Sequence, residues 1–211
     1  MGRKIRHETR CTSCLLRPEH CICSIAPRFD LVTRVVLVTH WRELYTTTNT
    51  GRLLRLALKN CEMRVRGRRD EPVRQDGIAP AAGSGLVLFP GPGSRPLTVE
   101  SAGELAGPVT LVVPDGSWRQ ARRMPRREPA LAGLPHFHVE AARPSRYGLR
   151  RAPHPHCLCT LEAVAAALGI LEGPAIQTAL EDLLAEMVRR TLLARPRRPE
   201  PQPRHEATSA G

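Results

Sequence analysis

The sequence predicts an α/β domain in which a mostly parallel sheet is flanked by helices. Three observations support this class. Short apolar, β-branched runs recur along the chain, helical patterns alternate with them, and Gly, Pro or polar residues bound each run. The chain has 211 residues, of which 41% are hydrophobic, so it can bury a core. This composition excludes a wholly disordered protein.

Four short strands are predicted, because each run is apolar and ends at turn-forming or polar residues. The first, Val35–Val38, leads into Thr39 and His40. The other three are Leu86–Phe89, Val109–Val113 and, as a fourth candidate, Phe137–Val139. The charged, Gly- and Pro-punctuated stretch 67–85 is predicted to be a surface loop.

Helices are predicted between and after these strands. Polar residues 45–49 offer N-caps for a helix through Leu53–Leu58, and an arginine-rich helical segment follows Trp118. A further helix covers Thr160–Ile170, and a long helix with an apolar stripe begins at Gly173-Pro174.

Composition divides the chain into three parts. Residues 1–30 form a basic, cysteine-rich element, and residues 31–193 carry the strands and helices. Residues 194–211 are a Pro/Arg tail that we expect to be disordered.

Three of the predicted strands end in unusual clusters, namely His40–Glu43, Pro90–Gly93 and Asp115–Trp118. In parallel α/β sheets, ligands bind beyond the carboxyl ends of the strands. We therefore expect these three loops to meet in one pocket.

The net charge of +12 favours a polyanionic partner, with RNA or DNA first. Aromatic residues make up only 3% of the chain, which argues against a protein that grips single strands by stacking. Two arginine clusters stand out: Arg119, Arg122, Arg123, Arg126 and Arg127, and then Arg143, Arg146, Arg150 and Arg151. Each alone is explained by a solvated charged face, but their positions beside the predicted pocket loops favour phosphate contacts with RNA.

No membrane partner is expected. The longest apolar run, Ala163–Leu171, lies between two glutamates and is far too short to cross a bilayer. The amino terminus is basic but lacks the apolar stretch of a secretory signal, so a cytoplasmic protein is expected. No feature of the sequence indicates an oligomeric state.

The cysteines predict a metal site. Seven cysteines, an odd number, do not suggest a disulfide framework, and four of them cluster as Cys11, Cys14, Cys21 and Cys23. Four thiolates suit a closed, structural zinc site. The alternatives are a set of free reduced thiols, or His20 in place of one cysteine.

Two features of the predicted pocket loops have both a chemical and a structural interpretation. Asp115 follows an apolar strand, where partial desolvation suits a carboxyl to proton transfer, but it is equally a candidate N-cap, with Ser117 as second choice. The Pro90–Gly93 glycines either form a plain turn or let the backbone approach a small ligand. Cys159–Glu162 has the outline of a capping box, with Thr160 as an alternative cap.

Taken together, these motifs resemble the DTW-domain family, the tRNA-uridine aminocarboxypropyltransferases. In chain order the motifs are C-x2-C and C-x-C within Cys11–Cys23, THWRE at Thr39–Glu43, TNTGRL at Thr48–Leu53, LFPG at Leu88–Gly91, DGSW at Asp115–Trp118, YGLRR at Tyr147–Arg151 and CTLEAVAAAL at Cys159–Leu168. The resemblance extends from Cys11 to about Leu192. It departs from the family pattern at Ser117, where a Thr is usual, and at Cys159, where a Ser is usual.

The resemblance implies a fold akin to the SPOUT methyltransferases, with a knotted C-terminal part. It also implies a reaction in which S-adenosylmethionine donates its 3-amino-3-carboxypropyl group to N3 of a uridine in tRNA, which leaves methylthioadenosine. Two alternatives stay open: a zinc-stabilised RNA-binding module without catalysis, and the same transfer onto ribosomal RNA. The sequence does not identify the uridine.

The resemblance also assigns residues. Asp115 is the first candidate base for the N3 proton and His40 the second. Trp118 either packs the adenine or braces its loop, and we expect bracing. The residues expected to hold the donor are Leu88, Phe89, Pro90, Gly91, Asp115, Gly116, Ser117, Trp118, Leu158, Cys159, Thr160 and Glu162. Those expected to hold tRNA phosphates are Arg52, Arg119, Arg122, Arg123, Arg146 and Arg150.

Overall fold

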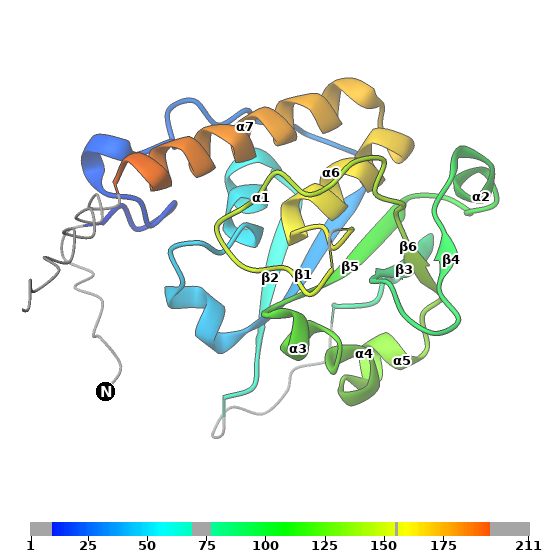
Figure 1. Cartoon of the computed structure of the whole chain (residues 1–211). Helices are drawn as coiled ribbons and strands as arrows, with labels where there is room; N and C mark the ends of the chain where they lie inside the picture. Colours follow the sequence, from blue (N-terminus) through cyan, green and yellow to red (C-terminus); the bar gives the residue numbers. More distant parts are fainter. Residues whose placement is uncertain (1–9, 69–76, 155, 195–211) are drawn as a thin grey trace, which may run out of the picture.

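A computed structural model describes residues 10–68, 77–154 and 156–194, and its centre is a six-stranded, fully parallel sheet (Figure 1). The strand order is β2-β1-β5-β3-β6-β4, with every neighbouring pair parallel. The strands are β1 (Arg34–His40), β2 (Cys61–Arg66), β3 (Ser84–Leu88), β4 (Arg95–Pro96), β5 (Val109–Asp115) and β6 (His136–His138). The predicted α/β class with a parallel sheet is confirmed.

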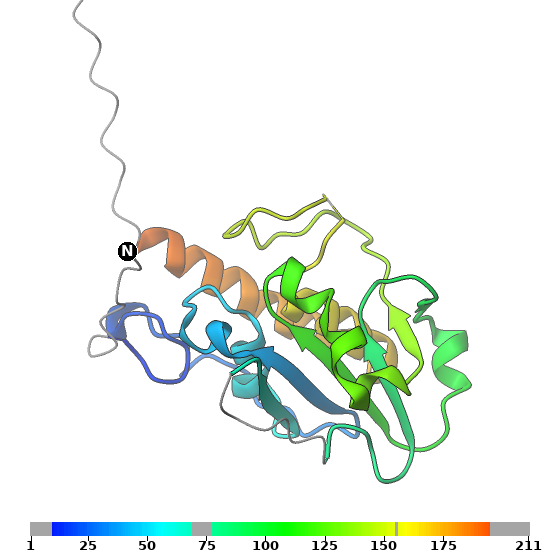
Figure 2. The same ribbon diagram turned by 90° about the horizontal axis from the view of Figure 1, so that it is seen from below.

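Helices cover both faces of the sheet, with α1, α6 and α7 on one side and α3, α4 and α5 on the other (Figures 1 and 2). The longer helices are α1 (Gly51–Ala57), α6 (Thr160–Leu171) and α7 (Pro174–Leu193). The short ones are η2 (Pro18–His20), η3 (Trp41–Tyr45), α2 (Val99–Gly103), α3 (Trp118–Ala121), α4 (Met124–Arg127) and α5 (Pro129–Ala132), of which η2 and η3 are 3-10 helices.

Strand alternation divides the core between these two faces. Val35 and Leu37 of β1 pack on the side of α6 and α7, whereas Val36 and Val38 pack against Met124 and its neighbours. All four β1 side chains are fully buried. A strand that is buried on both faces has a continuous run of apolar residues, and this run is why the sequence predicted β1.

The register of β1 and β5 positions the site. Thr39 pairs with Asp115, so both strands end at the same edge of the sheet. Because β5 lies between β1 and β3, its last residue is enclosed from both sides. Asp115 is accordingly 1% exposed.

The predicted strands and long helices are confirmed to within a few residues, and the differences have physical reasons. β2 was not predicted because Cys61–Arg66 has only a half-buried, largely polar pattern. The arginine-rich segment after Trp118 is three short helices, since Pro125 and Pro129 interrupt it. The stretch 67–85 ends earlier than predicted, because β3 begins at Ser84.

Some expectations concern parts of the chain outside the described residues. The tail 194–211, which we expected to be disordered, lies outside the described residues apart from Ala194. Residues 69–76 of the predicted surface loop also lie outside the described residues. Within the described part of the chain, no helix combines the length and apolar character needed to cross a membrane.

Candidate active site

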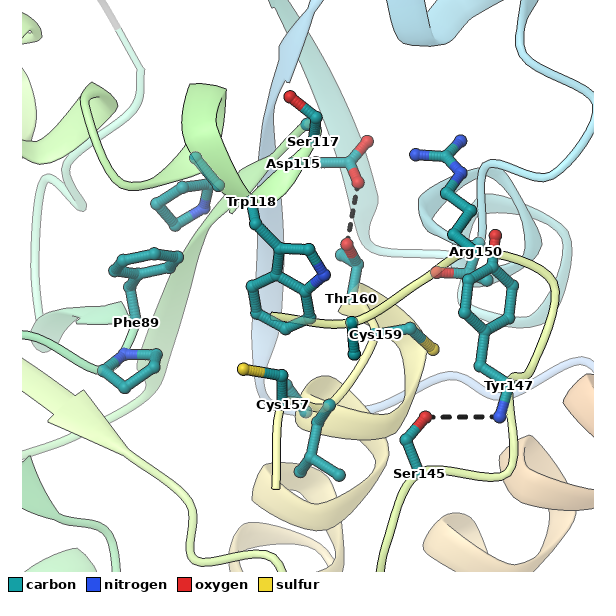
Figure 3. A pocket seen from close by; sticks show the side chains of 18 of the residues that line it. Phe89, Asp115, Ser117, Trp118, Ser145, Tyr147, Arg150, Cys157, Cys159 and Thr160 are labelled. Atoms are coloured by element: carbon teal, nitrogen blue, oxygen red, sulfur yellow. Dashed lines mark hydrogen bonds between the residues drawn. The ribbon is translucent and has the colours of Figure 1, made fainter. Parts of the chain in front are cut away.

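A cavity of about 640 Å³ lies at the carboxyl ends of the strands (Figure 3). Of the three strand-end loops expected to meet there, Pro90–Gly93 and Asp115–Trp118 contribute to its wall, whereas no residue of His40–Glu43 does, so that part of the prediction is wrong. Three segments line it: Leu88–Pro90 at the end of β3, Asp115–Trp118 at the end of β5 and Leu158–Thr160 at the start of α6. Pockets for small ligands commonly have volumes of about 300–1,000 Å³. The cavity is therefore large enough for a nucleoside-sized molecule.

Of the residues expected to hold a donor molecule, Gly91 and Glu162 are not in the cavity wall. Gly91 is exposed in a turn closed by Ser94. Glu162 is buried, and its carboxylate accepts hydrogen bonds from Ser145 Oγ at 2.7 Å and from the backbone N–H groups of Arg146 and Cys159 at 2.8 and 2.9 Å. It therefore holds the cavity wall in place from behind.

The carboxylate of Asp115 accepts three hydrogen bonds from three different segments. Thr39 Oγ1 and Asn49 Nδ2 donate to its Oδ2 at 3.1 and 2.9 Å, and Thr160 Oγ1 donates to its Oδ1 at 2.8 Å. Gly51 approaches so closely that an added Cβ would lie 2.8 Å from Asp115 Oδ2. The chain needs glycine at this first position of α1 because of that contact.

Burial raises the pKa of Asp115, while the hydrogen bonds from Asn49, Thr160 and Thr39 act in the opposite direction. The net direction is upward, so this carboxyl binds a proton more readily than an exposed aspartate. Asp115 does not cap the next helix. Ser117 does: its Oγ accepts from Gln120 N–H, and its own N–H donates to Gln120 Oε1.

Trp118 and Cys157 both lie in the cavity wall (Figure 3). Trp118 is partly exposed, which differs from the simple core residue that apolar character alone would suggest. Its ring offers a flat apolar surface of the kind that packs against purines.

His40 does not line the cavity, although it ends the strand next to Asp115. Strand alternation turns Thr39 toward Asp115 and His40 to the other side of the sheet. His40 Nδ1 accepts a hydrogen bond from the backbone N–H of Arg42, and the ring stacks on Trp41. Burial and the neighbouring Arg42 lower the pKa of His40.

Residues 139–154 and 156–159 lie between β6 and α6 (Figure 1), and we call them the cavity loop because many of them line the cavity. Tyr147 anchors it by donating its hydroxyl to the backbone carbonyl of Thr48. Arg150 anchors it a second time: its Nε donates to Thr48 Oγ1 at 2.9 Å, and its two terminal nitrogens contact both oxygens of Glu43 at 2.7 and 3.2 Å.

Glu43, Thr48 and Asn49 are central to these contacts but are not among the site residues that the sequence predicts. The sequence places Glu43 in an expected pocket loop and predicts only helix caps at residues 45–49. Asn49 does act in that way, since its Oδ1 accepts from Arg52 N–H at 3.0 Å.

The arginines expected to bind RNA fall into two groups. Arg119, Arg122, Arg123 and Arg146 are exposed, the first three on and just after α3 at the cavity edge. Arg150 and Arg52 already bind protein groups: Arg150 is paired with Glu43, and Arg52 donates to the carbonyls of Ser13 and Leu44.

The four clustered cysteines are confirmed as one group. The Sγ atoms of Cys11, Cys14, Cys21 and Cys23 all lie within 4.8 Å of one another, with 3.6 Å between Cys11 and Cys23 and 3.7 Å between Cys14 and Cys21. Zn–S bonds of about 2.3 Å in a tetrahedron require sulfurs about 3.8 Å apart. The four thiols therefore fit one zinc ion, whereas His20 is not part of the group.

The sequence model of the DTW domain matches residues 8–192, which is most of the chain. The chain belongs to the DTW domain family. The matched range includes the cavity segments, among them Asp115–Trp118.

Two curated proteins with sequences similar to this chain are both named tRNA-uridine aminocarboxypropyltransferase 2. The Drosophila melanogaster protein is 41% identical over 88 residues, covering 42% of this chain and 34% of its own. The Macaca fascicularis protein is 26% identical over 172 residues, covering 79% of this chain and 58% of its own. The DTW-domain chain thus spans less than two thirds of either relative.

One solved structure is also similar, that of the SAM-dependent rRNA:acp-transferase Tsr3 from Vulcanisaeta distributa. The TM-score is 0.47 at 18% sequence identity, and the match covers 76% of this chain and 78% of that chain.

The cysteine geometry predicts about one zinc ion per chain in the purified protein, measured by elemental analysis. Cys14→Ser removes a buried ligand and is expected to lower both the zinc content and the melting temperature, because metal binding stabilises the folded state. Cys157→Ser, outside the cluster, is the control and is expected to keep the metal. Full zinc content in the Cys14 variant contradicts the assignment.

Proposed function

We propose that this protein transfers the 3-amino-3-carboxypropyl group of S-adenosylmethionine to N3 of a uridine in tRNA. The observation that carries the proposal is the single cavity formed by the turns after β3 and β5 and the segment before α6. Membership of the DTW domain family and the names of the curated relatives support the same activity.

The cavity wall fits such a donor in its chemistry. Phe89 and Trp118 supply apolar surface for an adenine ring, and Asp115 is the buried acidic group. We therefore assign Trp118 to adenine packing in place of the bracing role that we expected from the sequence, because its ring lies in the cavity wall. When bound, S-adenosylmethionine supplies a sulfonium leaving group, so the chemical step needs little covalent help from the protein. The task of the cavity residues is to aim the γ-carbon of the longer arm, rather than the methyl group, at the pyrimidine.

The reaction forms a bond between uridine N3 and the γ-carbon and breaks the bond between that carbon and sulfur. The N3 proton must leave during this step, so a nearby acceptor increases the rate. We assign the acceptor role to Asp115, because its carboxylate lines the cavity and burial raises its pKa. His40, the second candidate, lies outside the cavity wall.

Exposed arginines beside the cavity supply the RNA-binding surface. Arg119, Arg122 and Arg123 are exposed on and just after α3, and Arg146 is exposed on the cavity loop. Guanidinium contacts to phosphates give affinity and register without reading sequence. In our proposal, Arg150 and Arg52 support the site from within the protein and do not bind tRNA directly.

We also propose that residues 31–193 form the catalytic domain and that residues 1–30 form a zinc-binding element.

We further propose that the C-terminal part is knotted as in the SPOUT methyltransferases. The path of the chain supports this proposal. After β6 the cavity loop returns across the carboxyl ends of the sheet and is bonded to Thr48, ahead of α1, before α6 packs beside α1 (Figure 1).

The first test is an assay of the purified protein with S-adenosylmethionine and unmodified tRNA, followed by mass analysis of the nucleosides. Uridine carrying the aminocarboxypropyl group and free methylthioadenosine are expected. Small-subunit ribosomal RNA is the parallel substrate, and turnover on it alone assigns the activity to that RNA. Methylated uridine, or RNA binding without any product, refutes the transfer.

The two candidate bases differ in their expected effects. Asp115→Asn is expected to lower kcat by about 10²–10⁴-fold, the usual contribution of a proton acceptor. In the unmodified enzyme, kcat/KM should fall as the pH drops through a midpoint above the ordinary aspartate value, because the protonated carboxyl cannot accept the N3 proton. His40→Asn is expected to keep this pH profile and most of the activity. The opposite ranking makes His40 the base.

The exposed arginines are tested by the double substitution Arg122→Ala/Arg123→Ala. The KM for tRNA should rise about tenfold with little change in kcat, and the salt dependence of binding should become shallower, since fewer phosphates are neutralised. Arg17→Ala/Arg189→Ala removes the same charge from exposed positions elsewhere on the fold and is the control. Equal effects of the two pairs indicate that only net charge matters.

A further inference from the structure

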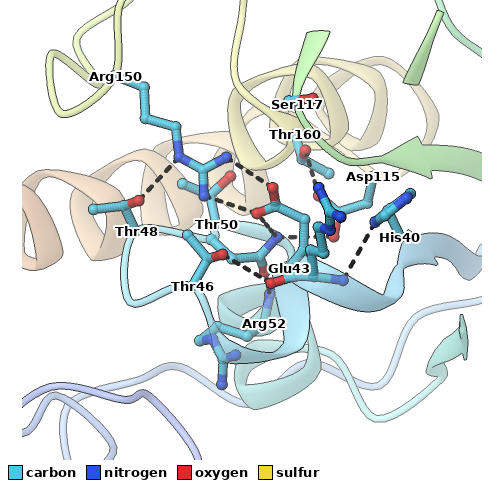
Figure 4. Close-up of polar contacts among 12 residues, drawn as sticks. His40, Glu43, Thr46, Thr48, Thr50, Arg52, Asp115, Ser117, Arg150 and Thr160 are labelled. Carbon is cyan, nitrogen blue, oxygen red and sulfur yellow. Dashed lines mark hydrogen bonds and ion pairs between the residues drawn. The ribbon is translucent and has the colours of Figure 1, made fainter. Parts of the chain in front are cut away.

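Glu43 is a second buried carboxylate close to Asp115. It lies in η3, directly after β1, and is 6% exposed. A carboxylate this well buried requires charge-paired or hydrogen-bonded partners, because an isolated one is strongly destabilising. Its partners connect it to the candidate base (Figure 4).

The side-chain amide of Asn49 bridges the two carboxylates. Its Nδ2 lies 2.9 Å from Asp115 Oδ2 and 3.3 Å from Glu43 Oε2. An amide nitrogen carries two hydrogens, so it can donate one to each carboxylate. The amide oxygen is occupied on the other side, where it accepts from Arg52 N–H.

This arrangement fixes the orientation of the amide. Turning it over would place its oxygen against two carboxylates and its N–H groups against the N–H of Arg52, which are repulsive contacts in a buried site. Arg150 fixes Glu43 in turn, with one terminal nitrogen on each carboxylate oxygen. The contacts thus run from the cavity loop through Glu43 and Asn49 to Asp115.

We propose that Glu43 is a positioning residue: through the Asn49 amide it sets the orientation and charge environment of the Asp115 carboxylate, and through Arg150 it ties that environment to the cavity loop. The proposal rests on the transferase function and deepens it. The reaction then needs two carboxylates, one that faces the substrate and one that does not.

Charged and titratable groups approach Asp115 from several elements. They are Glu43 of η3, Arg52 of α1, Cys61 of β2 and Arg150 of the cavity loop. Of these, Glu43 contributes the negative charge that favours a protonated Asp115, after the larger effect of burial. Removing that charge also frees Arg150, and both changes favour the ionised form of Asp115.

The first measurement does not need turnover. The Asp115 side-chain carboxyl carbon is followed by NMR during a pH titration of the full chain. Glu43→Gln keeps the shape of the side chain and is expected to lower the titration midpoint. Glu104→Gln is the control, because Glu104 is exposed, pairs with Arg95 and lies outside the site. A midpoint that is unchanged or raised in Glu43→Gln overturns the electrostatic part of the proposal.

The second measurement tests whether Glu43 acts through Asn49. Glu43→Gln and Asn49→Ala are each expected to lower kcat about tenfold or more, with the KM for S-adenosylmethionine changed less than about threefold. If Glu43 acts on Asp115 through Asn49, the kcat of the double variant is little lower than the kcat of Asn49→Ala alone. Multiplicative losses, or losses confined to KM, overturn the positioning role.

These outcomes are separable from failure of the function itself. If the unmodified protein makes no aminocarboxypropyl uridine, the proposed function fails, whereas the NMR titration still reports whether Glu43 sets the state of Asp115. If the unmodified protein is active and the double variant shows multiplicative losses, only the positioning role fails. Thermal melting of each variant identifies any loss that comes from unfolding.

Discussion

The site depends on one buried carboxylate held by donors from three parts of the chain. Thr39 at the end of β1, Asn49 ahead of α1 and Thr160 at the start of α6 all donate to Asp115. Burial of an ionisable group without such partners would cost several kcal/mol, roughly. These hydrogen bonds therefore fix where the three segments meet, and the cavity lies where they do.

The cysteine element is connected to this centre by arginine side chains that donate hydrogen bonds to backbone carbonyls. Arg52, two residues after Thr50, donates to the carbonyl of Ser13 within the cysteine cluster and to that of Leu44 in η3. At the far side, Arg190 of α7 donates to the carbonyl of Cys21. A zinc ion that orders the cysteine loops would thereby also order the segment that holds Glu43 and Asn49. None of the described residues 10–30 of this element is in the cavity wall.

The buried polar contacts also explain why some arginines serve the protein rather than a partner. The side chain of Arg150 is 29% exposed and is bound to the side chain of Glu43, of which 7% is exposed. In contrast, Arg122 and Arg123 are exposed beside the same cavity. In a chain so rich in arginine, residue type alone does not separate these roles, because the position of the partner carboxylate decides them.

The sequence by itself determined the parallel α/β fold, the long C-terminal helices, the cysteine cluster and the meeting of two of the three strand-end loops, since His40–Glu43 is not part of the cavity wall. These follow from local composition, since buried strands are apolar and strand ends in a parallel sheet share one edge. It did not reveal β2, whose half-buried polar pattern is not typical of a strand, nor the roles of Glu43 and Asn49. Only the tertiary structure turned His40 away from the cavity and placed Arg150 on Glu43. Such contacts join residues far apart in the chain, and no local pattern encodes which buried donor will face which carboxylate.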